Sequence, residues 1–227
     1  MIKKHIPNAI TCANLFSGCI GIVYAFKGDL EVAAYLVVLS GIFDFFDGFA
    51  ARLLNVKSPI GKELDSLADM VSFGFLPGVV MFQLLSVSDY SSEYLPYFGF
   101  VITVFSALRL AKFNIDTRQT EDFIGLNTPM NTLFVVSLPF IKADYPSVIG
   151  STALLVGLTA ILSVLLVSEI RIFSMKFGTK GWKNNQMKYL FLLLSVLLVV
   201  ALKFVAVPFI LMLYIGLSIV HFRRIPK

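Results

Sequence analysis

The chain consists of long apolar runs that are separated by short polar segments. Most runs contain about 20 residues, the length that an α-helix needs to cross a hydrocarbon core about 30 Å thick. Because a chain in lipid must satisfy its own backbone hydrogen bonds, the pattern predicts an all-α membrane protein, a polytopic bundle of eight transmembrane helices. We expect these helices over residues 7–27, 31–54, 62–88, 94–114, 127–142, 147–170, 186–203 and 205–222.

The composition supports this prediction. Hydrophobic residues make up 57% of the 227 residues and charged residues 15%, and the mean hydropathy is +0.84. So few charges cannot cover a soluble domain. No small-residue cleavage site follows the first run, so we expect that run to be retained. Without a long linker or an internal repeat, residues 1–227 are expected to form one membrane-embedded domain, which the helices at 147–222 complete.

The basic residues are distributed unevenly between the loops. Of the nineteen Lys and Arg residues, only Lys27, Lys142 and Lys203 fall on one side when successive helices alternate in direction. The others fall at both termini and near residues 57, 118 and 179. The positive-inside rule therefore predicts that both termini are cytoplasmic in a multi-pass protein of the cell membrane. Membrane topology explains the net charge of +5, so no nucleic-acid partner is indicated.

Four aspartates interrupt two of the apolar runs. Asp44 and Asp47 are three residues apart, and Asp65 and Asp69 are four apart, so each pair projects from one face of its helix. Only a short loop with the sequence NVKSPIGK separates the two helices. We expect an antiparallel helix pair that brings all four carboxylates together near the cytoplasmic end of the membrane.

A cluster of carboxylates in an apolar run requires positive charge beside it. A single ionised carboxylate at the centre of a membrane helix costs about 2.5–3.5 kcal/mol, and four would also repel one another. Arg52 and Lys62 supply only two charges, and no Cys or His lies nearby. Hard oxygen ligands predict a site for Mg²⁺ or Mn²⁺, with Ca²⁺ as a possible substitute, and we expect two ions.

Small residues accompany the acids. Gly48 follows Asp44 by four residues, Ala51 follows Asp47 by four, and Gly61 precedes Asp65 by four. These positions keep the helix faces beside the acids open, either for a neighbouring helix or for the phosphate of a ligand. Together with the carboxylates, they favour a site for metal ions and phosphate.

The whole stretch has the pattern D-x₂-D-G-x₂-A-R-x₈-G-x₃-D-x₃-D, which runs from Asp44 to Asp69. It resembles the signature of the CDP-alcohol phosphotransferase family at every fixed position. The resemblance implies a membrane enzyme that binds a CDP-linked lipid and divalent metal ions. Such an enzyme transfers the phosphatidyl group to an alcohol and releases CMP. The resemblance also implies a homodimer.

The resemblance assigns a role to each matching residue. It implies that Asp44, Asp47 and Asp65 bind metal ions, and that Asp69 deprotonates the acceptor while lying close to a metal. His5 and His221 lie near the chain ends, so a histidine base is not indicated. On the first helix, Asn8, Thr11 and Asn14 share one face. These side chains could form hydrogen bonds between helices. For Asn8 and Thr11, the resemblance also implies contact with the ligand. The implied CDP-binding residues are Asn8, Thr11, Asp47, Gly48, Ala51, Arg52, Gly61 and Asp65.

The acceptor alcohol depends on sequence outside the motif. The segments KELDSLADMVSFGFLPG, RLAKFN and DFIGLNTPMN resemble the phosphatidylserine synthase branch of the family, which implies L-serine as acceptor and CDP-diacylglycerol as donor. Asn127, Met130 and Asn131 stand where proline and two alanines are common in that branch. Serine carries an ammonium and a carboxylate, and the candidates for its pocket are Glu63, Arg109, Lys112, Asn114 and Arg118. Glu63 could instead favour the positive end of its helix, and Arg109 could balance the aspartates.

Other functions stay open at this point. The same chemistry could use glycerol 3-phosphate, an inositol phosphate or choline as acceptor, or an archaeal lipid as donor. A cation transporter also places acids in membrane helices, but it predicts acids at several depths. Here they lie on two adjacent helices at one end, which favours the enzyme.

The two cysteines lie on the first predicted helix. Cys12 and Cys19 are seven residues apart, or about 10 Å along the helix axis. This separation excludes a disulfide between them. We expect both thiols to be buried.

Overall fold

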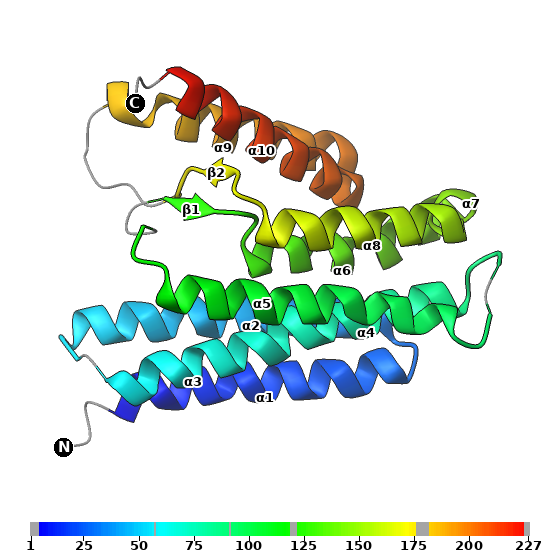
Figure 1. The fold of residues 1–227 in the computed structure, drawn as a ribbon, viewed down its shortest axis with the longest axis horizontal. Coiled ribbons are helices and arrows are strands. Elements are labelled where there is room, and N and C mark those ends of the chain that lie inside the picture. The colour runs from blue at the N-terminus through cyan, green and yellow to red at the C-terminus, as the bar shows by residue number, and fades with distance from the viewer. Residues whose placement is uncertain (1–4, 57, 91, 119–121, 176–181, 225–227) are drawn as a thin grey trace.

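The structure is a computed structural model that describes residues 5–56, 58–90, 92–118, 122–175 and 182–224. Its long helices lie side by side as roughly parallel rods (Figure 1). Each predicted apolar run contains a helix. The helices are α1 (Ile6–Phe26), α2 (Leu30–Leu53), α3 (Pro59–Asp69), α4 (Leu76–Ser86), α5 (Val101–Ile115), α6 (Thr128–Asp144), the short α7 (Pro146–Ile149), α8 (Thr152–Val167), α9 (Trp182–Leu202) and α10 (Ala206–Arg224).

Five helical segments in the described part of the chain are long and apolar enough to cross a membrane. They are Ile6–Phe26, Leu30–Leu53, Pro59–Ser86, Leu95–Ile115 and Asn185–Arg223. The last segment contains both α9 and α10, which a 3₁₀ turn at Lys203–Val205 connects, and the apolar helix α8 is shorter. The prediction of an all-α membrane protein is therefore confirmed, whereas eight crossings stay a prediction.

The helices alternate in direction. α1 begins and α10 ends at the same end of the bundle, which also contains the α2–α3 connection and the end of α5 (Figure 1). Gly28 turns the chain between α1 and α2 with a φ of 83°, and Asp29 then caps α2 by accepting a hydrogen bond from the Val32 amide. Ser58 caps α3 in the same way through the Gly61 amide. Lys57 and the loop around residue 179 lie outside the described residues.

A π-helical segment joins α3 to α4 immediately after Asp69. It covers Met70–Phe75, and its wider turns leave carbonyl groups open to partners outside the helix. The Thr132 hydroxyl of α6 donates to the Phe73 carbonyl at 2.7 Å, and the Thr103 hydroxyl of α5 donates to the Gly74 carbonyl at 3.1 Å. Two other helices therefore hold the segment that follows Asp69.

Residues beyond α8 are attached through a short two-stranded sheet. Strand β1 (Phe123–Ile124) pairs antiparallel with β2 (Arg171–Ile172), which the apolar pattern did not predict. Next to β2, the carbonyl of Phe173 accepts a hydrogen bond of 2.6 Å from the Tyr214 hydroxyl of α10. The ring of Phe173 packs against those of Phe191 and Tyr214. The last two helices thus dock on the residue after β2.

The prediction that the two thiols are buried was wrong. Cys12 and Cys19 are both free and exposed on α1. The buried residues of α1 include Thr11, Asn14 and Gly18, which occupy the opposite side of the helix. A sequence that is apolar on every side does not indicate which of its faces is turned toward lipid.

Candidate active site and metal centre

Four aspartates of α2 and α3 converge, as their spacing predicted. Carboxylate oxygens of Asp44, Asp47 and Asp65 all lie within 4.8 Å of one another. Asp69 lies one turn further along α3, and its carboxyl group interacts electrostatically with Asp44 and Asp65. Asp47 is the most enclosed of the three grouped residues, with 6% of its surface exposed.

Helix α1 supplies polar partners to the aspartates. The Thr11 hydroxyl donates a hydrogen bond of 2.6 Å to Oδ2 of Asp47. Nδ2 of Asn14 lies 3.5 Å from Oδ1 of Asp69, and the Asn14 side chain is fully buried. The backbone carbonyl of Asn14 accepts from the Ser40 and Ser72 hydroxyls, which fixes α1 against α2 and the π-helical segment.

The cluster has the chemistry of a cation site. None of the ion pairs among the described residues involves the four aspartates. Arg52 is exposed, and the Lys62 ammonium donates instead to the carbonyl of Asn114 at 3.2 Å. Grouped carboxylate oxygens without a paired lysine or arginine suit a hard divalent cation. Asp44, Asp47 and Asp65 could hold such an ion.

A pocket of about 470 Å³ opens beside Asp47 and Asp65. Every predicted CDP-binding residue except Arg52 lines this pocket, together with Pro7, Val56, Ser58, Pro59 and Lys62. A Cβ atom on Gly48 would approach only the Arg52 guanidinium, at 3.8 Å, so the space before Gly48 is open. Gly48 therefore faces the open cavity, whereas a Cβ atom on Gly61 would approach Oδ1 of Asn8 on the neighbouring helix α1 to 2.9 Å.

The predicted acceptor residues separate into different environments. Arg109 has 6% of its surface exposed, lies over the Phe113 ring with its Cζ atom 4.7 Å from the ring centroid, and interacts electrostatically with Asp69. Asn114 donates to the Ser66 hydroxyl at 2.9 Å and so ties α5 to α3. Glu63 is exposed, and it lies about 160° around the helix from Asp65. The structure thus brings Arg109 to the aspartates and does not bring Glu63 there.

Comparison with known proteins shows which family the chain belongs to. The family model described as CDP-alcohol phosphatidyltransferase matches residues 4–172. The chain belongs to the CDP-alcohol phosphatidyltransferase family. The matched region contains all four aspartates and ends with β2, so α9 and α10 lie beyond it.

Named relatives cover most of this CDP-alcohol phosphatidyltransferase. A CDP-diacylglycerol–serine O-phosphatidyltransferase of Helicobacter pylori is 38% identical over 168 residues, which is 73% of this chain and 70% of the relative. The enzyme of that name from Bacillus subtilis is 37% identical over 173 residues, 74% of this chain and 89% of the relative. An archaetidylserine synthase of Methanothermobacter thermautotrophicus is 28% identical over 168 residues, covering 73% and 68% of the two chains.

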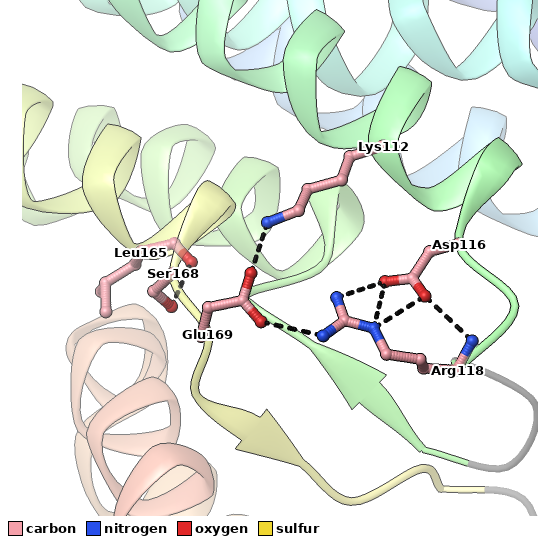
Figure 2. A network of polar contacts seen from close by, with 6 residues as sticks. All are labelled: Lys112, Asp116, Arg118, Leu165, Ser168 and Glu169. Carbon is pink, nitrogen blue, oxygen red and sulfur yellow. Dashed lines mark hydrogen bonds and ion pairs between the residues drawn. The ribbon is translucent and has the colours of Figure 1, made fainter.

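In this family member, the other two predicted acceptor residues take part in a surface network (Figure 2). The Lys112 ammonium lies 2.6 Å from Oε1 of Glu169, and Arg118 pairs with both Asp116, at 2.8 Å, and Glu169, at 3.5 Å. The hydrogen bond from Lys112 lowers the pKa of Glu169, which lies beyond the end of α8. Lys112 and Arg118 are therefore already paired within the chain, unlike Arg109.

Glu169 was not among the predicted site residues. Lys112 and Glu169 are separated by 57 positions, so no local spacing connects them. A second feature that the sequence did not indicate is an apolar groove of about 300 Å³ between α2 and α6. It is lined by Val37, Val38, Gly41, Ile42, Phe45, Phe46, Phe73, Pro129 and Leu133. Both features depend on contacts between helices that are remote in the chain.

Proposed function

We propose that this enzyme transfers the phosphatidyl group of CDP-diacylglycerol to the hydroxyl of L-serine, which gives phosphatidylserine and CMP. The observation that carries the proposal is the group of Asp44, Asp47 and Asp65 beside a pocket lined by the small residues of the motif. The names of the Helicobacter and Bacillus relatives support serine as the acceptor.

In this proposal, the donor headgroup occupies the pocket beside the aspartates. Asn8, Thr11, Gly48, Ala51 and Gly61 contact the CDP moiety, with Arg52 at the outer edge. Asp44, Asp47 and Asp65 hold two Mg²⁺ or Mn²⁺ ions, and Asp69 adjoins them. Ca²⁺ could bind the same oxygen donors, since it also prefers carboxylates.

The apolar groove between α2 and α6 receives an acyl chain of the donor. On α2, residues 37, 38, 41, 42, 45 and 46 line the groove, and residues 47, 48 and 51, which follow directly on the same helix, line the CDP pocket. Asp44 lies near the end of the first stretch, and Asp47 begins the second. A lipid with its diphosphate at the aspartates would therefore have its nucleotide on one side and its hydrocarbon on the other.

The chemical step uses Asp69 as the base. The serine hydroxyl transfers its proton to the Asp69 carboxylate while its oxygen attacks the phosphatidyl phosphorus. The bond between this phosphorus and the bridging diphosphate oxygen breaks, and CMP leaves with the electron pair. Divalent cations, when bound, would neutralise charge on the phosphoryl oxygens and on the leaving phosphate. Thr11 holds Asp47 through its 2.6 Å hydrogen bond, so this ligand is oriented before the substrate arrives.

Of the predicted acceptor-binding residues, Arg109 has the environment that best suits a contact with the acceptor. It is buried and charged, and it is close to Asp69 without being paired to it. Lys112, Asn114 and Arg118 would shape the entrance from the polar end of α5, where they already bond to Glu169, Ser66 and Asp116. Glu63 would act only at a distance from the reacting atoms.

The remaining parts of the proposal concern the whole molecule. A cytoplasmic active site and cytoplasmic termini are supported by the basic residues at the end of the bundle that holds the aspartates. A single domain over residues 1–227 is supported by the docking of α10 on Phe173. A homodimer is supported by the family resemblance alone.

One alternative donor has a specific observation in its favour. The relative from Methanothermobacter thermautotrophicus, at 28% identity, is named an archaetidylserine synthase. Since the polar reaction would be the same, the groove between α2 and α6 would receive an isoprenoid chain. Assays with both CDP-lipids, at equal serine concentration, discriminate between these donors.

The direct test is serine incorporation by the purified protein in detergent or nanodiscs. We expect radiolabelled L-serine to enter lipid only with CDP-diacylglycerol and Mg²⁺ or Mn²⁺, with CMP released in equal amount. Inert serine, together with turnover of glycerol 3-phosphate, inositol phosphate or choline, would reject serine as acceptor. Cation flux without CMP release would instead indicate a transporter.

Asp69→Asn tests the base. We expect turnover to fall by about 10²–10⁴-fold, the usual contribution of a general base, while CDP binding is retained. Asp29→Asn at the other end of α2 is the matched control, because asparagine also caps helices. Normal turnover in Asp69→Asn would remove Asp69 from this role.

A further inference from the structure

The beginning of α6 carries two fully buried polar side chains without a partner among the described residues. Thr128 and Asn131 have no exposed surface. Within the part of the chain that the structure describes, Oγ1 of Thr128 and both Oδ1 and Nδ2 of Asn131 make no hydrogen bond. Buried amides and hydroxyls are almost always paired, because leaving them unpaired is costly. These groups therefore indicate a partner that the chain does not supply.

Their position follows from the neighbouring residue Thr132. Thr128, Asn131 and Thr132 share one face of α6, and the Thr132 hydroxyl contacts the Phe73 carbonyl in the π-helical segment. The rod α3–α4 and α6 run in the same direction (Figure 1). One turn back along each helix leads from Phe73 to Asp69 and from Thr132 to Thr128. Thr128 thus lies at the level of Asp69, and Asn131 lies between the levels of Asp69 and Phe73.

Helix α5 adds a further buried hydroxyl, that of Ser106, which has no hydrogen-bond partner in the described part of the chain. Ser106 adjoins the π-helical segment, where its Cβ lies 3.2 Å from the place of a Cβ on Gly74. Arg109 follows one turn later on the same face, and it interacts electrostatically with Asp69. No hydrogen bond or ion pair links its guanidinium to another described residue. Among the described residues, Thr128, Asn131 and Arg109 therefore have free hydrogen-bonding capacity near the proposed base, and Ser106 adds a fourth such group closer to Gly74.

The free groups can all act as donors to an anion. A guanidinium, a hydroxyl and an amide NH₂ each offer N–H or O–H groups, and a guanidinium binds a carboxylate with two parallel bonds. The first turn of α6, which Asn127 caps, adds the positive end of the helix dipole. An ammonium is attracted by the neighbouring aspartates instead.

We propose that Asn131 and Thr128, together with Arg109, bind the anionic group of the acceptor, which is the α-carboxylate when the acceptor is serine. This inference rests on the proposed function and adds the residues that select the acceptor. The serine hydroxyl then lies toward Asp69, and the ammonium lies toward the surplus negative charge of the aspartates. Glycerol 3-phosphate would present a phosphate to the same donors, so the test must separate these two acceptors.

The test combines variants with truncated acceptors. Asn131→Leu keeps the volume and removes both polar atoms, and Thr128→Val removes one hydroxyl. Ser195→Ala on α9 is the matched control, because the Ser195 hydroxyl is also buried without a partner in the described chain, but on a helix away from α3 (Figure 1). For each protein we would measure KM for serine and for CDP-diacylglycerol, CDP binding, and inhibition by 3-hydroxypropanoate and ethanolamine.

We expect Asn131→Leu to raise KM for serine by about 10- to 100-fold, which corresponds to one hydrogen bond to a charged group. Inhibition by 3-hydroxypropanoate, which keeps the carboxylate, should weaken by a similar factor. Inhibition by ethanolamine, which lacks the carboxylate, should be unchanged, as should CDP binding and KM for CDP-diacylglycerol. Thr128→Val should show the same selectivity with a smaller factor, and Ser195→Ala should resemble wild type.

The outcomes separate this inference from the proposed function. If the wild-type enzyme uses serine and both variants keep its KM, the inference is wrong and the function stands. Equal loss of ethanolamine and 3-hydroxypropanoate inhibition would also overturn it, because the effect would then not concern the carboxylate. If wild type uses glycerol 3-phosphate instead of serine, the proposed function is wrong. The anion subsite is then supported if the two variants raise KM for glycerol 3-phosphate, and it is rejected if they do not. If Asn131→Leu does not bind CDP, its site is not intact, and the KM for serine of Thr128→Val tests the inference instead.

Discussion

The hydrogen bond between Thr11 and Asp47 allows a quantitative prediction about metal binding. Thr11 is 3% exposed and Asp47 is 6% exposed, so water has little access to replace a lost donor. Thr11→Val removes the hydroxyl and keeps the shape of the side chain. The Asp47 carboxylate would then lose its 2.6 Å contact and with it the orientation toward Asp44 and Asp65. We expect weaker metal binding without loss of the fold.

The size of the effect follows from the type of bond. A hydrogen bond to a charged group contributes about 1.5–3 kcal/mol, which corresponds to about 10- to 160-fold in a dissociation constant. The hydroxyl also lies 3.0 Å from the Pro7 carbonyl, but its single hydrogen favours the shorter contact to the carboxylate. Loss of a partner that orients a metal ligand typically weakens binding by about 10- to 100-fold, which agrees with this range.

Mn²⁺ titration followed by electron paramagnetic resonance measures this constant without substrate. Thr11→Ser restores the donor and should restore most of the affinity. Ser17→Ala on the same face of α1 is the control, because it removes a hydroxyl bonded to the Leu36 carbonyl and not to the aspartates. If Thr11→Val bound Mn²⁺ as wild type does, Thr11 would not orient a metal ligand. If Thr11→Ser were as weak as Thr11→Val, the effect would come from packing.

Two further predictions concern the surroundings of the site. Thr132→Val leaves the Phe73 carbonyl without its outside donor, so we expect the free energy of unfolding to fall by about 1–3 kcal/mol. The control is Ser137→Ala, which is also on α6 but removes a hydroxyl that bonds to the Phe134 carbonyl, and it should leave turnover unchanged. If Thr132→Val kept wild-type stability and turnover, the π-helical segment would not need the hydrogen bond from Thr132. Glu169→Gln removes the pairing with Lys112 and Arg118. Because pairing lowers the pKa of folded Glu169, its stabilisation is present at pH 7 and is lost as the pH falls through that lowered pKa. Glu169→Gln should therefore lower the thermal midpoint at pH 7, and the difference should shrink in acid and in high salt; a difference that persists in acid would contradict the ion pair.

Several features could be derived from the sequence because they depend on residues that are close in the chain. The length of the apolar runs predicted the helices, and spacings of three and four predicted that Asp44 and Asp47, and Asp65 and Asp69, share faces. A short polar loop then predicted that the two pairs meet. Each of these inferences uses helix geometry alone. The same geometry also separates Glu63 from Asp65, although chemical type alone made Glu63 a candidate.

Other features required the tertiary structure, because they depend on how helices are rotated and paired. Arg109, Lys112 and Arg118 are alike in charge, but only Arg109 is turned inward beside Asp69, and the other two pair with Glu169 and Asp116. In the sequence, Asn131 departs from the common loop pattern. In the structure, its side-chain amide is buried and has no hydrogen-bond partner in the described part of the chain.

The sequence by itself determined that this protein is a helical membrane protein with an acidic site formed by two adjacent helices. Helical periodicity carries that information, since it fixes which side chains share a face. The tertiary structure decided which faces meet, and therefore which polar groups are left for a substrate. Each helix carries apolar side chains on all of its sides, so the hydrophobic pattern does not specify how the helix is rotated about its axis. Packing contacts such as Thr132 with Phe73 and Thr11 with Asp47 show how each helix is turned.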